Sequence, residues 1–169
     1  MAEAKRILVA GVGYQNLRDM SVGPLLIERL RRREWPPGVQ IEDLSLGAIA
    51  ALHYLQLHPP FDAALFVGGE SCPKGTEAPG TIRRYAWSPP PGVGDDAVQD
   101  AVAEAVTGVI SLPAMLLVIG HFGALPARTR VIEIEPRDVE WGPDFSPPVM
   151  QALEEAEEMV LQEVREMTS

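Results

Sequence analysis

The sequence predicts an α/β fold, a three-layer sandwich in which helices flank a mainly parallel five-stranded sheet. Short, continuous apolar runs that end in glycine, as in residues 6–11 and 62–69, are typical of strands buried in a parallel sheet. Segments with helical spacing of apolar residues alternate with these strand-like runs. Because 169 residues are enough to build one hydrophobic core, we expect a single domain over 1–169.

The N-terminal third begins with the strand at 6–11 and continues into a helix. Ser21 is a residue type that caps helices, and Pro24 is tolerated in a first helical turn. Apolar residues then recur at helical spacing from Val22 to Leu30, and the "WPPG" sequence ends the helix. Two more elements follow, a strand at 39–44 and a helix at 48–57.

The rest of the chain continues the alternation of strands and helices. A helical pattern spans 97–122, where Pro113 divides it and Ser111 is the expected N-cap of the second piece. The remaining elements are strands at 62–69, 81–87 and 129–135 and a final helix from Ser146–Pro147 towards Met167.

The composition excludes several classes of function. Acidic residues outnumber basic ones by 24 to 14, and the net charge of −10 argues against a nucleic-acid partner. A single cysteine, Cys72, excludes an internal disulfide and a cysteine-cluster zinc site. No apolar run approaches the roughly 20 residues of a membrane span, and the N-terminus lacks the layout of a signal peptide. We therefore expect a cytoplasmic protein with no membrane partner.

The loops at the carboxyl ends of the strands are where a parallel sheet binds its ligands. Gly11 and Gly13 follow the first strand, but Asn16 stands where a dinucleotide-binding G-x-G-x-x-G loop needs its third glycine. The chain has neither a P-loop nor a G-x-S-x-G nucleophile elbow. The three histidines are isolated, which favours structural roles: His53, His58 and His121. The residues alone therefore predict an acidic α/β domain without a complete catalytic set.

Two stretches of the chain carry a resemblance. The first, "RILVAGVGYQNLRDMSVG", contains a strand, two glycines, Asp19 and the start of a helix. It resembles the opening of the [NiFe]-hydrogenase maturation protease family, which has a strand, G-x-G-N, an acidic pair, a small residue and glycine, then a helix. The second, "IEIEPRDVEWGPDFSPPVMQALEEAEEMVL", resembles its C-terminal strand, Pro-Glu-type turn, "W-G" segment and closing helix. With "FDAALFVGG" and "APGTIRRY" in order between them, the resemblance spans nearly the whole chain.

The resemblance implies a protease that removes a C-terminal extension from the hydrogenase large subunit after nickel insertion. It also implies a Glu, an Asp and a His as metal ligands, a set that suits nickel or zinc. At the corresponding positions this chain has Met20, Gly68 and Gly108, and "LSLGA" (44–48) replaces a glycine-rich loop. A thioether is a poor ligand for these ions and glycine offers no side chain, so no metal cofactor is expected.

We therefore expect a non-catalytic recognition or assembly factor for the large subunit or its maturation factors. The expected cleft residues are Gly13, Asp19, Met20, Gly47, Gly68, Gly69 and Gly108. One alternative is an active endopeptidase with a relocated nickel or zinc site, for which Asp19 and Glu70 are the catalytic candidates and Asp95 and Asp96 further substitutes. Another is an α/β domain that binds a small ligand or a different protein in the same cleft.

Overall fold

The computed structural model describes residues 4–104 and 111–169, and all five of its strands lie in one sheet. The strand order is β2-β1-β3-β5-β4, with β4 antiparallel to β5 and every other pair parallel. This confirms the predicted α/β fold with a mainly parallel sheet. The strands are β1 (Ile7–Val12), β2 (Val39–Asp43), β3 (Ala63–Gly69), β4 (Ile82–Ala86) and β5 (Arg128–Ile134).

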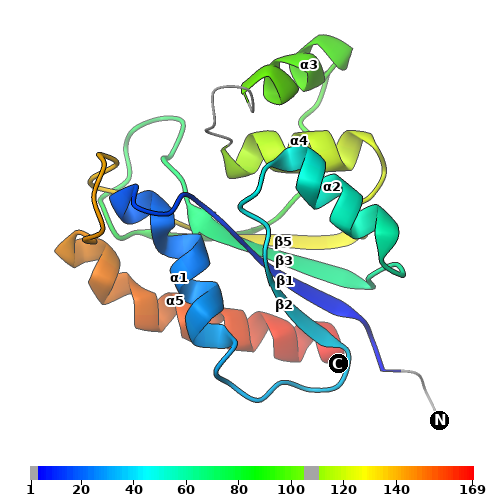
Figure 1. Cartoon of the computed structure of the whole chain (residues 1–169), viewed down its shortest axis with the longest axis horizontal. Coiled ribbons are helices and arrows are strands. Elements are labelled where there is room, and N and C mark those ends of the chain that lie inside the picture. Colours follow the sequence, from blue (N-terminus) through cyan, green and yellow to red (C-terminus); the bar gives the residue numbers. More distant parts are fainter. Residues whose placement is uncertain (1–3, 105–110) are drawn as a thin grey trace.

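Helices cover both faces of the sheet. Helices α1 and α5 lie on one face and α2 and α4 on the other, while α3 packs on α4 (Figure 1). The helices are η1 (Arg18–Ser21, a 3₁₀ turn), α1 (Val22–Leu30), α2 (Ala48–Leu57), α3 (Asp95–Glu104), α4 (Leu112–His121) and α5 (Pro147–Thr168). The Ser111 hydroxyl accepts a hydrogen bond from the Ala114 amide at 3.2 Å, which confirms Ser111 as the N-cap of α4. Among the described residues, none of the helices combines the length and the apolar character needed to cross a bilayer.

The central strands are buried on both of their faces. In β1 and β3, Leu8 and Phe66 face the core under α2 and α4, whereas Ile7 and Leu65 face the core under α1 and α5. A strand with two buried faces has no polar alternation, which is why these segments read as continuous apolar runs.

Glycines let α1 cross β1 at very short range. A Cβ atom at Gly23 would collide with the backbone oxygen of Val12, and one at Gly11 would lie 2.7 Å from the Gly23 oxygen. The close crossing brings the first turn of α1 against the carboxyl end of β1. The loop between them must therefore be compact.

Glu157 joins the two helices on one face of the sheet. Its carboxylate is nearly fully buried on α5 and accepts hydrogen bonds from Arg29 at 2.9 Å and Arg33 at 2.6 Å. Because both arginines are partly exposed, they stay solvated while they neutralise the buried charge. One buried carboxylate thus links α5 to α1 and to the turn that follows α1.

We expect Glu157→Gln to lower the free energy of unfolding by about 2 kcal/mol, because the amide loses charge-assisted hydrogen bonds with both arginines. Urea denaturation measures the change. Glu158→Gln is the matched control, since the neighbouring Glu158 is 67% exposed and lies 4.0 Å from Arg33. Equal midpoints for the two variants would contradict the assignment.

Candidate functional site

Asp19 lies at the carboxyl end of the sheet and is almost fully buried. Its carboxylate accepts backbone hydrogen bonds from Arg137 and Asp138, both at 2.9 Å, and from Ser146 at 2.8 Å. The Ser146 hydroxyl donates a fourth, at 2.7 Å. Burial works against ionisation, but these four hydrogen bonds outweigh it and hold the pKa of Asp19 below its ordinary value of 3.8. The carboxylate is thus fully engaged in fixing the segment before α5.

Two loops distant in the sequence are bound into one unit around Asp19. The Gly142 amide donates to the Asn16 oxygen at 2.7 Å, and the Arg18 amide donates to the Gly142 oxygen at 3.1 Å. Asn16 and Arg18 both have positive φ, 61° and 42°, which side-chain-bearing residues rarely adopt. The same unit presents Trp141, 75% exposed, and Val139, 50% exposed. An ordered apolar surface therefore borders this end of the sheet.

Three of the expected cleft positions are filled by close backbone contacts. A Cβ atom at Gly68 would lie 2.7 Å from the Val12 oxygen, and one at Gly69 would lie 2.5 Å from the Asp19 oxygen. A Cβ at Gly13 would collide with the backbone oxygen of Met20. The resemblance implies an aspartate at position 68. At Gly68 and Gly69, however, neighbouring backbone atoms would have to move before any side chain could fit.

The remaining expected cleft positions are Met20, Gly47 and Gly108, and none of them carries a carboxylate or an imidazole. Met20 is half-buried, and its backbone oxygen accepts a hydrogen bond from the Tyr14 amide at 3.0 Å. Gly47 has a φ of 106° and forms the N-cap of α2, next to the loop in which Ser45 accepts a hydrogen bond from Gly13. Gly108 lies outside the described residues, and α4 begins at Leu112 and Pro113, without a histidine.

Glu70 carries the most perturbed carboxyl group at this edge. It is half-buried at the end of β3 and accepts a hydrogen bond from the Leu112 amide, 3.3 Å away at the start of α4. Burial, followed by the nearby Glu133 carboxylate, raises its pKa from 4.5 to about 7. The Asp19 carboxylate accepts hydrogen bonds from the 137–146 segment, and the Glu70 carboxylate accepts them from the backbone of Leu112 and Ser71, so the two candidate carboxylates share no hydrogen-bond partner.

A buried ionic network lies beside Glu70, and the sequence analysis did not find it. Arg83 on β4 contacts Glu133 at 3.3 Å and Glu135 at 2.6 Å, and it donates to the backbone oxygen of Glu70. The Tyr85 hydroxyl donates to Glu133 at 2.9 Å. The sequence signal is the arginine of one strand and the alternating glutamates of "EIE", because Arg83 and Glu133 are partners across the antiparallel β4–β5 pair.

No metal-binding cluster occurs in the part of the chain that the structure describes. Within residues 4–104 and 111–169, no three His, Cys, Asp or Glu side chains are grouped so that they could hold an ion. Asp95 and Asp96 are exposed in the first turn of α3, where negative charge favours the helix dipole. They therefore occupy the capping region that their sequence suggests.

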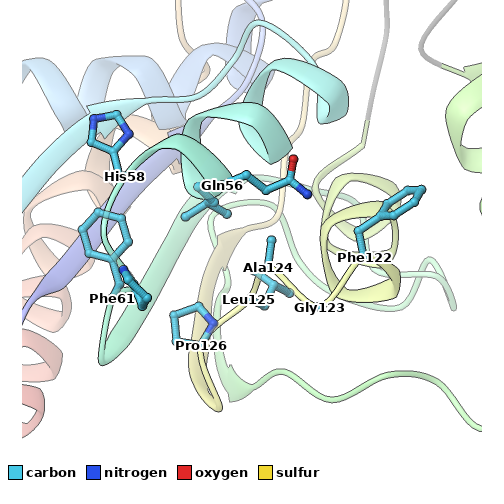
Figure 2. A pocket seen from close by; sticks show the side chains of 10 residues that line it. Gln56, His58, Phe61, Phe122, Gly123, Ala124, Leu125 and Pro126 are labelled. Carbon is cyan, nitrogen blue, oxygen red and sulfur yellow. The ribbon is translucent and has the colours of Figure 1, made fainter.

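Two cavities differ in their relation to the sheet. One, of about 380 Å³, lies at the carboxyl end, between the 14–21 loop, α1 and the segment before α5; its lining includes Gln15, Asn16, Arg31 and Phe145. The other, of about 350 Å³, is shown in Figure 2 and lies at the ends of α2 and α4. Phe61 and Pro126 line it just before β3 and β5 begin, so it belongs to the amino ends of the strands. The first cavity is therefore the better candidate for a binding cleft.

We expect Asp19→Asn to destabilise the fold by about 2–3 kcal/mol, because an amide group would face backbone donors that now meet a carboxylate. Urea denaturation at neutral pH measures the loss. Asp144→Asn, an exposed change in the same segment, is the control and should leave the midpoint unchanged. A midpoint for Asp19→Asn within error of the wild type would contradict the buried anchoring role.

Glu70 should make stability depend on pH. Because its folded-state pKa of about 7 lies above the ordinary 4.5, the native state retains a proton that the unfolded chain releases between those values. Stability therefore falls as the pH rises from about 4.5 to 7, and the loss persists above 7. Glu70→Gln should remove this part of the loss.

At pH 8 we expect Glu70→Gln to be more stable than the wild type by about 1–2 kcal/mol, a value reduced for partial exposure. At pH 4 the two proteins should agree. Urea midpoints across this range measure the effect, with Glu77→Gln, an exposed change in the same loop, as the control. Parallel pH profiles for the wild type and Glu70→Gln would refute the assignment.

Comparison with known proteins finds the same fold in solved structures. No family model matches the chain, and no curated protein matches it at the sequence level. Solved structures do match: the hydrogenase maturating endopeptidase HybD from E. coli is 26% identical, with 95% of this chain and 93% of that chain covered and a TM-score of 0.67.

Two archaeal structures agree with this match. The [NiFe] hydrogenase maturation protease HycI from Thermococcus kodakarensis KOD1 is 16% identical, with 96% of this chain and 94% of that chain covered and a TM-score of 0.69. The hydrogenase 2 maturation peptidase from Thaumarchaeota archaeon SCGC_AB-539-E09 is 21% identical, with 95% and 98% covered and a TM-score of 0.64. The chain therefore has the fold of the hydrogenase maturation proteases.

Proposed function

We propose that this protein binds a [NiFe]-hydrogenase large subunit, or a factor of its maturation, without cleaving it. The observation that carries the proposal is the lack of room for a side chain at Gly68 and Gly69, where backbone oxygens lie too close. In addition, Met20 stands at the expected glutamate position, and the first turn of α4 has no metal-ligating side chain. A metal-dependent peptidase needs ligands that converge on the ion with an open position for the reacting water. The described residues of this edge offer no such set, so we propose a role without a metal cofactor.

The same edge is suited to holding a peptide. The cavity at the carboxyl end of the sheet combines apolar and hydrogen-bonding groups, including Gln15, Arg31 and Phe145. Trp141 and Val139 add exposed apolar surface on a loop that Asp19 fixes in place. Exposed aromatic residues beside a polar cleft are typical of protein-binding sites. The matched structures are named as maturation proteases of hydrogenases, which supports this class of partner.

An active endopeptidase with a relocated metal site is the second candidate. Glu70 favours it, since a half-buried carboxyl with a pKa of about 7 is suited to proton transfer near neutral pH. Against it, the hydrogen bonds of Asp19 and Glu70 go to different segments, and Asp95 and Asp96 lie in the first turn of α3. We therefore place binding first.

The test is to incubate the purified protein with a nickel-loaded large-subunit precursor that carries its C-terminal extension. We expect the two to co-elute and the precursor to keep its intact mass, with substoichiometric nickel and zinc on the purified protein. Loss of the C-terminal extension would establish the endopeptidase instead. Failure to co-elute would reject the large subunit as the partner.

A pair of surface variants locates the binding site. Trp141→Ser should weaken precursor binding about tenfold, the usual scale for an aromatic interface residue. Leu57→Ser is the matched control, because Leu57 is 83% exposed at the end of α2, away from the cleft loops. Equal binding by both variants would exclude the Trp141 surface.

A further inference from the structure

A groove runs between α3, α4 and the proline-rich segment after β4. Two cavities, of about 210 Å³ and 380 Å³, meet along it and share Trp87, Pro90 and Leu117 in their linings. The Trp87 ring lies so close to Gly120 that a Cβ atom there would collide with it. The groove therefore has a fixed aromatic floor, held in place by a glycine of α4.

Apolar side chains of α3 and α4 form part of the walls of the groove. Val98 and Ala101 are the buried residues through which α3 packs on α4. Leu117 of α4 is only partly buried, and Val93, just before α3, is 36% exposed. The groove thus presents apolar side chains that the described part of the chain leaves partly uncovered.

The acidic side chains around the groove come from α3, and His121, in the lining of the smaller cavity, lies 3.9 Å from one of them, Asp95. The sequence from residue 85 to residue 127 contains no Lys or Arg. Its four acidic residues are all in α3: Asp95, Asp96, Asp100 and Glu104. Asp100 and Glu104 line the larger cavity, and their i, i+4 spacing places them on one face of the helix. An apolar groove with carboxylates along one side attracts positively charged segments and repels negatively charged ones.

We propose that this groove docks a positively charged segment of a partner protein through one large apolar side chain. The anchor fills the space beside Trp87 and Leu117, where a cavity of about 210 Å³ accommodates a leucine or phenylalanine side chain. Lys or Arg residues of the same segment pair with Asp100 and Glu104. The groove shares no lining residue with the cavity at Gln15 and Asn16, so the proposal stands apart from the function proposed above.

The test uses the full chain labelled with 5-fluorotryptophan and two synthetic peptides of equal charge. An amphipathic Lys–Leu peptide should shift the ¹⁹F resonance of Trp87 and leave that of Trp35 unmoved, whereas a Lys–Ser peptide should shift neither. The double variant Asp100→Lys, Glu104→Lys should weaken Lys–Leu binding at least tenfold. The matched control is Glu154→Lys, Glu158→Lys, the same charge change at the same spacing on the exposed face of α5. Circular dichroism establishes that both variants are folded.

Three results would overturn the proposal. The first is a Trp87 resonance that the Lys–Leu peptide does not move. The second is an equal loss of affinity in the α5 control, which would mean that the peptide responds only to net charge. The third is a concentration-dependent dimer that the α3 variant abolishes, which would make a second copy of this chain the occupant.

Discussion

The hydrogen bonds of the buried Asp19 carboxylate are the interaction on which the loops at the carboxyl end of the sheet depend. Its hydrogen-bond donors lie more than 115 residues away in the sequence, so one side chain joins the turn after β1 to the segment that precedes α5. Ser146 illustrates the dependence, because its hydroxyl bonds to Asp19 and does not cap the helix it precedes. An ionised carboxylate can accept four hydrogen bonds at once, which no other side chain of this size does.

The fold could be predicted because its signals are local. The apolar runs of β1 and β3 and the Ser111 cap of α4 each lie within a few consecutive residues. Ser21 shows where local reasoning fails: it stands at the N-cap position of α1, but its hydroxyl accepts from Leu17 and donates to Tyr14, inside the loop. Where a side chain has several hydrogen-bond partners within reach, tertiary contacts determine which partner it takes, and a single sequence does not state those contacts.

For the candidate site, the sequence predicted which positions to inspect but not how they are arranged in space. The resemblance indicated which residues replace the expected ligands, but not that backbone oxygens of Val12 and Asp19 occupy the space beside Gly68 and Gly69. It also gave no sign that Glu70 accepts a hydrogen bond from the start of α4. These facts depend on distances between strands and loops, which a single sequence does not state. A side chain at position 68 would require a shift of the backbone at Val12, its partner on β1.

The paired loops also affect the entropy of association. Gly142 exchanges two backbone hydrogen bonds with Asn16 and Arg18, so the residue just before it, Trp141, is exposed on a backbone that is already ordered. Ordering a flexible backbone costs about 1–2 kcal/mol for each residue. A partner that binds this loop meets a preorganised surface and forgoes most of that cost, so even a small interface could support useful affinity.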